Sequence, residues 1–158
     1  MTKKIIVIAV VVLIIDQFLK VLVDANMLLN ESITVINNLF YITYTNNYGA
    51  AWGIFQNQIF FLVTVSLIAL IIIYRFMFTF KSNLRNEIAF GLLFGGIAGN
   101  LLDRLFLGSV RDFIDLRIFG YHFPVFNIAD IVIVIGVFLL IFAIIKGEDH
   151  ENNRRRKS

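Results

Sequence analysis

Four long apolar runs set the organisation of the chain. They cover residues 5–23, 59–80, 88–107 and 124–145. A helix rises about 1.5 Å per residue, so each run is long enough to cross the roughly 30 Å of hydrocarbon in a bilayer. The pattern predicts an all-α polytopic membrane protein with four transmembrane helices. We expect one membrane-embedded domain over residues 1–158, with a polar cytoplasmic tail at 146–158.

The segment between the first two runs has a pattern typical of strands. Two stretches, 34–36 and 40–45, are rich in β-branched and aromatic residues and flank Asn37-Asn38, a pair typical of turns. We therefore expect a small β structure outside the membrane, between transmembrane helices 1 and 2. The segment at 108–123, between the third and fourth runs, is expected to be a loop.

Composition agrees with a membrane protein. Hydrophobic residues make up 59% of the chain, and the mean hydropathy is +0.83. Ten of the fourteen Lys and Arg fall in the two termini and at residues 75–87. By the positive-inside rule that side is cytoplasmic. Arg104, Arg111 and Arg117 go against the rule, which indicates that nearby acids hold them on the outer side.

The N-terminus also has some features of a cleaved signal peptide, because two lysines precede an apolar run. No small-residue cleavage site follows, however, and Asp16 and Lys20 interrupt the run. We therefore expect a retained first helix. Asp16 and Lys20 are four residues apart with the acid first, so they share a helix face and can pair.

Polar residues recur at one depth in different predicted helices. Counted at about 1.5 Å per residue, the outer half of the hydrocarbon contains Asp16, Asn100, Asp103 and Asp130. Asn127 and Asp130 share one helix face, as do Asn100, Asp103 and Arg104. Ionisable groups at membrane depth are costly and are therefore functional candidates. The pattern predicts a shared polar pocket that opens outward, although ion pairs such as Asp103–Arg104 could also be structural.

The residue inventory narrows the possible chemistry. The chain has no Cys and two His, which excludes thiol catalysis and a histidine-rich metal site. A Ser109–Lys20 pair is conceivable, but Asp16 already neighbours that lysine. Paired aspartates remain. Two close carboxylates share a proton, so one can take a proton from water while the other donates to an oxyanion or leaving amine.

Several sequence blocks occur in order along the chain. They are D-Q-F-L-K (16–20), N-Y-G-A-A-W-G (47–53), G-N-L-L-D-R (99–104), G-S-V-R-D-F (108–113) and F-N-I-A-D (126–130). In this order and at these spacings they resemble the signature blocks of lipoprotein signal peptidase, or signal peptidase II, across essentially the whole chain. One departure is Leu19, where the family often has a small hydroxyl residue.

The resemblance implies an intramembrane aspartyl endopeptidase of the bacterial cytoplasmic membrane. Such an enzyme removes signal peptides from diacylglyceryl-modified prolipoproteins, cleaving before the lipidated cysteine, at a site near the outer leaflet beneath a β-cradle. Carried over by position, the catalytic dyad is Asp112 and Asp130. The positions implied to support the dyad or hold substrate are Asp16, Lys20, Asn47, Gly49, Asn100, Asp103, Arg104 and Asn127.

The resemblance also implies which partners to expect. These are prolipoproteins, membrane lipid and globomycin-type inhibitors; we expect a monomer, with no cofactor, no metal and no nucleic-acid partner. Asp115 is interpreted as a loop residue outside the dyad. Because Asp112 and Asp130 lie on opposite sides of Pro124, the chain between them must fold back to bring them together.

Two other classes of protein are alternatives. A small proton- or ion-coupled transport protein needs polar groups across the whole bilayer. Residues 60–73 and 132–145 of the spans are nearly free of polar groups, apart from Thr64 and Ser66. A purely structural membrane subunit has no need for several unlike polar blocks at one depth. Both alternatives are therefore less favoured than a membrane hydrolase.

Overall fold

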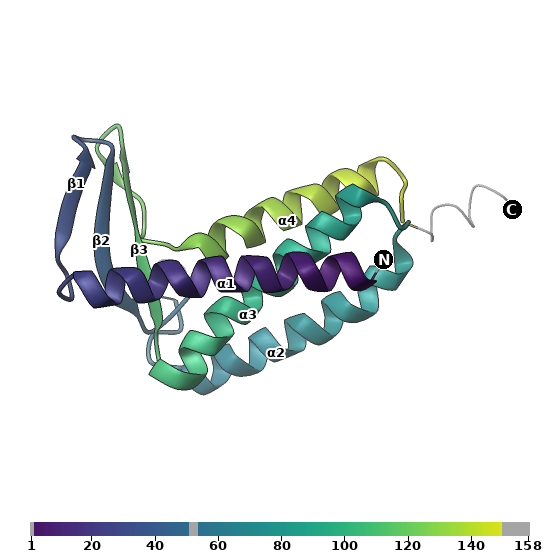
Figure 1. Cartoon of the computed structure of the whole chain (residues 1–158), viewed down its shortest axis with the longest axis horizontal. Helices are drawn as coiled ribbons and strands as arrows, with labels where there is room; N and C mark the ends of the chain where they lie inside the picture. Colours follow the sequence, from purple (N-terminus) through teal and green to yellow (C-terminus); the bar gives the residue numbers. More distant parts are fainter. Residues whose placement is uncertain (1, 51–53, 150–158) are drawn as a thin grey trace, which may run out of the picture.

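Four long helices form an elongated bundle that has a small sheet at one end (Figure 1). The structure is a computed structural model that describes residues 2–50 and 54–149. Its helices are α1 (Thr2–Asn26), α2 (Ile59–Phe76), α3 (Leu84–Leu107) and α4 (Ile128–Ile145), with a 3-10 turn, η2 (Met77–Thr79), after α2. In these described ranges, four helices are long and apolar enough to cross a membrane, as predicted.

The helix boundaries differ from the expected ones because of capping. α3 begins at Leu84, inside the expected polar loop, because the Asn83 side chain accepts a hydrogen bond from the backbone N–H of Asn86 at 2.9 Å. α4 begins at Ile128 rather than at Pro124. Its N-cap is Asn127, and the side chains of Asn127 and Asp130 each accept a backbone N–H of the other, which forms a capping box.

The sheet is antiparallel, with strand order β1-β2-β3-β4. The strands are β1 (Ser32–Ile36), β2 (Phe40–Asn47), β3 (Val110–Ile118) and β4 (Tyr121–His122). The expected turn is confirmed, with Asn38 at φ 61°. The expectation of a loop over 108–123 is wrong, because β3 pairs with β2, and so the sheet is not confined to the segment between the first two helices. Figure 1 shows its strands running across the helix axes.

α3 is the central helix and packs against α1, α2 and α4. Its glycines allow this close approach, as expected. A Cβ atom at Gly96 would lie 2.7 Å from the carbonyl oxygen of Ala129, and one at Gly99 would lie 2.5 Å from Oδ2 of Asp16. Both distances are well below van der Waals contact. The α4 backbone and the Asp16 side chain of α1 therefore lie directly against the bare face of α3 at the level of the polar residues.

The end of the bundle opposite the sheet contains the N-terminus and the end of α4 (Figure 1). Residues 146–149, the first part of the expected polar tail, pack back on the start of α3. Glu148 pairs with Arg85 and accepts a hydrogen bond from Asn83 Nδ2 at 2.8 Å. The remainder of the expected tail, residues 150–158, lies outside the described residues.

Adding a methyl group at Gly96 is expected to destabilise the bundle. The new Cβ would clash with Ala129 O and with Ile133 Cγ1, both at 2.7 Å, so α4 must move away from α3. Gly96→Ala should lower the free energy of unfolding by about 1–3 kcal/mol. Val7→Ile adds a carbon on an exposed face of α1 and should change it by less than about 0.5 kcal/mol. Thermal unfolding in detergent micelles tests this, and equal melting temperatures would contradict it.

Candidate active site

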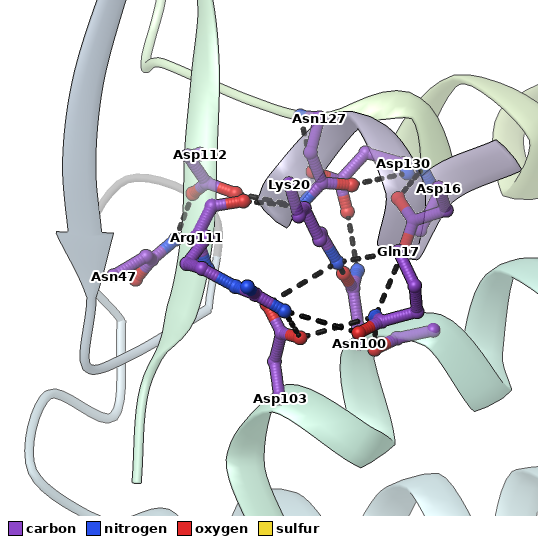
Figure 2. A network of polar contacts seen from close by, with 12 residues as sticks. Asp16, Gln17, Lys20, Asn47, Asn100, Asp103, Arg111, Asp112, Asn127 and Asp130 are labelled. Carbon is purple, nitrogen blue, oxygen red and sulfur yellow. Dashed lines mark hydrogen bonds and ion pairs between the residues drawn. The ribbon is translucent and has the colours of Figure 1, made fainter. Parts of the chain in front are cut away.

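A buried cluster of charges joins two helices to the sheet (Figure 2). Lys20 Nζ lies 2.9 Å from Asp16 Oδ2 and 3.5 Å from Asp103 Oδ2, and Arg111 Nη2 lies 2.8 Å from Asp103 Oδ1. All four residues are buried. The predicted Asp16–Lys20 pair is therefore confirmed. Two acids and two bases make the cluster neutral, as buried charges require.

Gln17 and Arg111 belong to this cluster, although the sequence analysis did not assign them to a site. Gln17 Nε2 donates to Asp103 Oδ1 and to the carbonyl oxygen of Gly99, each at 3.1 Å, while its Oε1 accepts from Arg111 Nη2 at 3.0 Å. Each has a signal in the sequence that could have identified it. Gln17 is a polar residue inside an apolar run, and Arg111 is a basic residue on the outer side of the membrane.

Arg104 does not pair with Asp103, so the ion pair considered from the sequence is wrong. Adjacent residues on a helix do not face each other, and Asp103 turns toward Arg111 and Lys20 instead. Arg104 Nη2 donates to the carbonyl oxygen of Gly49 at 3.2 Å. Its Nε is buried without a hydrogen-bond partner, and no carboxylate among the described residues forms an ion pair with it.

Asp130 accepts hydrogen bonds on both carboxylate oxygens. Asn100 Nδ2 donates to Oδ1 at 2.8 Å, and the backbone N–H of Asn127 donates to Oδ2 at 3.1 Å. Lys20 Nζ donates to Asn100 Oδ1 at 2.9 Å. Because an ammonium group only donates, Lys20 fixes the orientation of the Asn100 amide and turns its NH₂ group toward Asp130.

Asp112 is held in the same manner from the other side. Asn47 Nδ2 donates to Asp112 Oδ2 at 3.0 Å, and Asn127 Nδ2 donates to Oδ1 at 2.6 Å. Asn47 Oδ1 accepts the backbone N–H of Gly49 at 2.9 Å, which leaves its NH₂ group for Asp112. Asn127 therefore contacts both Asp112 and Asp130, as Figure 2 shows.

The chain between these aspartates folds back on itself. The backbone N–H groups of Phe113 and Ile114 donate to the carbonyl oxygen of Phe126 at 3.0 and 2.8 Å, and the N–H of Phe126 donates to the carbonyl oxygen of Ile114 at 3.1 Å. This pairing places the residue before Asn127 beside the residues that follow Asp112. The expected fold-back across Pro124 is thereby confirmed.

Asp112 and Asp130 line one cavity of about 530 Å³ together with Asn47, Asn100 and Arg104. Its remaining wall is mostly apolar and comes from residues 123–126 and from Ile131, Ile133, Val134 and Ile135 of α4. A second cavity of about 240 Å³ meets it at Asp112 and is lined by residues 45–50 and Gln56. The ten predicted site residues thus lie along the two cavities, in the buried charge cluster or, for Asn127, in hydrogen-bond contact with both aspartates.

Comparison with known proteins places the chain in a family. The model of the signal peptidase (SPase) II family matches residues 8–146. The chain belongs to the signal peptidase II family. A lipoprotein signal peptidase of Staphylococcus aureus is 42% identical over 153 residues, which cover 96% of this chain and 94% of the relative. The relative from strain JH9 of the same species matches equally.

Two solved structures share the fold. Each is described as a bacterial membrane enzyme determined by the in meso method, one at 2.3 Å and one at 1.9 Å resolution. Both are 43% identical to this chain and cover 90% of it, with TM-scores of 0.82 and 0.79. The alignments cover 87% and 92% of those chains, respectively.

Membership of the signal peptidase II family makes the protein a peptidase of lipoprotein processing. Together with four membrane-competent helices, it indicates a multi-pass protein of the bacterial inner membrane. The alternative of a transport protein is not favoured. Among the described residues, no group of three or more His, Cys, Asp or Glu side chains could hold a metal ion.

The pKa values of the two acids on β3 of this signal peptidase II fold shift in opposite directions. Burial, followed by the nearby charge of Asp130, raises the pKa of Asp112 to about 7. Burial also opposes ionisation of Asp115, but hydrogen bonds from Arg117 at 2.9 Å and Thr43 at 2.9 Å outweigh it and lower its pKa. Asp115 is therefore a paired strand residue, not the loop residue expected from the sequence.

Stability should depend on pH through Asp112. Its pKa is about 7 in the folded protein and about 3.9 in an unfolded chain, so between these values the folded state binds more protons. The free energy of unfolding is therefore higher at low pH, where Asp112 is protonated. It falls by at most about 4 kcal/mol through this group as pH rises from about 4 to 7. Asp112→Asn should have a smaller fall in melting temperature between pH 5 and pH 8 than the wild type. Parallel pH dependences in the two proteins would contradict the raised pKa.

Proposed function

We propose that the protein is an intramembrane aspartyl endopeptidase that removes signal peptides from diacylglyceryl-modified prolipoproteins. In this proposal it cleaves just before the lipidated cysteine, with Asp112 and Asp130 as the catalytic dyad. The observation that carries the proposal is that these two carboxylates line one cavity and are both held by Asn127. The family itself supplies the peptidase activity and the lipoprotein substrates.

The two aspartates have different roles in the proposed reaction. The pKa of Asp112, raised to about 7, keeps a large share of this carboxyl protonated at neutral pH. Asp130 accepts hydrogen bonds on both oxygens and lies in the first turn of α4, where the helix dipole favours a negative charge. We therefore assign Asp130 as the general base and Asp112 as the general acid.

The proton transfers then balance over one hydrolysis. Asp130 takes a proton from the attacking water while the water oxygen bonds to the scissile carbonyl carbon. At the same time Asp112 donates its proton to the developing oxyanion. Collapse of the tetrahedral intermediate breaks the C–N bond. The leaving amine receives the proton held by Asp130, the hydroxyl proton returns to Asp112, and the dyad regains its starting state.

The donors around the dyad are fixed before substrate binds. Lys20 orients the Asn100 amide, and Asn127 Oδ1 accepts the backbone N–H of Asp130 at 3.1 Å, so its NH₂ group must face Asp112. A preorganised polar site of this kind avoids reorganisation during the reaction. Fixed donors therefore keep both carboxylates turned toward the cavity.

Arg104 supplies the positive charge that the dyad needs. The cluster of Asp16, Lys20, Asp103 and Arg111 is already neutral, and a dyad that shares one proton has a single negative charge. Arg104 lines the same cavity, and no carboxylate in the described part of the chain forms an ion pair with it. We propose that it offsets the charge of the dyad and, through Gly49, fixes the edge of the cavity.

The two cavities suit the two parts of a lipoprotein precursor. The larger has an apolar wall along α4, which fits a signal peptide and the acyl chains of the lipidated cysteine. The smaller is lined by Thr45, Asn46 and Gln56, among other residues, and fits the polar chain that follows the cysteine. We propose that the sheet end faces outward, with both termini cytoplasmic, that globomycin-type inhibitors occupy the larger cavity, and that the protein acts as a monomer.

Removal of either carboxylate should abolish cleavage. Asp112→Asn and Asp130→Asn should each lower turnover of a purified diacylglyceryl-modified precursor by at least about 10²- to 10⁴-fold, because each removes a proton donor or acceptor. Asp115→Asn, on the same strand but paired with Arg117, is the matched control and should retain activity. Wild-type cleavage should require the diacylglyceryl group and be blocked by globomycin. Substantial turnover by either dyad variant would refute the assignment.

The rate should fall on the alkaline side of neutrality. Asp112 acts as an acid only while it is protonated, and its pKa is about 7, so kcat/KM should decline about tenfold per pH unit well above that value. The profile can be measured from pH 5 to 9 with a lipidated precursor in micelles. A rate that rises between pH 7 and 9 would show that Asp112 is not the proton donor.

A further inference from the structure

The two members of the proposed dyad belong to different layers of the fold. Asp112 lies on β3 of the sheet, whereas Asp130 lies in the first turn of α4 in the bundle. Their separation therefore depends on what fixes the sheet to the helices. We propose that Arg111 is the positioning residue that fixes β3, and with it Asp112, on α3; the inference rests on the proposed function.

Arg111 binds Asp103 through its backbone and its side chain. The backbone N–H of Arg111 donates to Asp103 Oδ2 at 3.0 Å, its Nε donates to the same oxygen at 3.2 Å, and its Nη2 donates to Oδ1 at 2.8 Å. This is a bidentate arginine–carboxylate pair with a third bond to the strand itself. Arg111 is buried and lines neither cavity.

The same face of α3 holds both aspartates. Asn100 donates to Asp130, and Asp103, one helical turn later, binds the residue next to Asp112. One turn of α3 therefore sets the spacing between β3 and the start of α4. A shift of Arg111 would move Asp112 with it, because the two are consecutive in the strand and pair with Asn46 and Thr45 of β2.

A second contact extends this attachment to the neighbouring strand. Arg111 Nη1 lies 3.9 Å from Asp24 Oδ2 at the end of α1, and Tyr44 of β2 donates its hydroxyl hydrogen to Asp24 Oδ1 at 2.6 Å. Burial and this hydrogen bond raise the pKa of Tyr44 to about 12, so the hydroxyl stays a donor. Arg111 and Tyr44 therefore fix β3 and β2 to the same helix end.

The first test separates position from substrate binding. Arg111→Met keeps much of the side-chain volume but removes the guanidinium group that binds Asp103. We expect kcat to fall at least tenfold while KM for a lipidated precursor changes less than twofold. Arg111→Lys keeps the charge without the bidentate geometry, so it should restore little of kcat. Arg117→Met, on the same strand and away from both cavities, should leave kcat and KM unchanged.

The outcomes are unambiguous. An unchanged kcat in Arg111→Met, a loss confined to KM, or full activity in Arg111→Lys would overturn the proposal. Melting temperatures confirm that each variant is folded at the assay temperature. Should Arg111→Met not fold, the comparison of Arg111→Lys with the wild type and with Arg117→Met decides the matter, because the lysine keeps the buried charge balanced.

The second test needs no activity. The chain has no Cys, so spin labels can be placed uniquely at Phe119→Cys, at the exposed tip of the β3–β4 hairpin, and at Leu105→Cys, exposed on α3. Double electron–electron resonance should give one narrow distribution of label-to-label distances when Arg111 is present. This distribution should broaden or shift when Arg111→Met or Arg111→Lys is added. An unchanged distribution would overturn the positioning role even if the dyad is correct, and a changed one would support it even if the dyad assignment fails.

Discussion

The requirement that buried charge be neutralised governs this structure more than any other constraint. Moving one unpaired ion into a low-dielectric interior costs several kcal/mol even after relaxation, which is comparable with the whole stability of a domain. Asp103 of α3 is where three elements satisfy this requirement together. Its carboxylate pairs with Lys20 of α1 and with Arg111 of β3. Helices and sheet can therefore pack in only one relative position without leaving a charge unpaired.

The site takes its properties from the same balance. Once Asp16, Lys20, Asp103 and Arg111 have neutralised one another, the carboxylates in the cavity have amide donors and Arg104 as their polar neighbours. Asn100 connects the two regions, since it accepts from Lys20 and donates to Asp130. Through Lys20 the buried cluster orients the Asn100 amide that donates to Asp130. Burial and the nearby charge of Asp130 keep the pKa of Asp112 raised, which suits this carboxyl to acid–base chemistry.

The sequence predicts the helices well and the sheet poorly, for physical reasons. Long apolar runs identify a membrane helix almost alone, and the shared depth of polar residues predicts a pocket. β3 is hidden because it contains four charged residues within nine, and because the consecutive charges Arg111-Asp112 break the alternation of apolar and polar positions that its second half shows. Arg111 becomes compatible with a buried strand only through Asp103 and Gln17, the latter 94 residues away, so no local pattern could reveal it. The mistaken Asp103–Arg104 pair has a local cause instead, because adjacent residues on a helix do not face each other.

Asn127 shows how helix formation and site formation depend on one residue. Its Oδ1 caps α4 by accepting the N–H of Asp130, and its Nδ2 donates to Asp112. An aspartate would cap the helix about as well as an asparagine. It would, however, place a third carboxylate against Asp112 and Asp130 and remove the donor to Oδ1 of Asp112, leaving only the Asn47 bond to Oδ2. The helix requires only an acceptor at this position, whereas the amide nitrogen is required by the proposed chemistry.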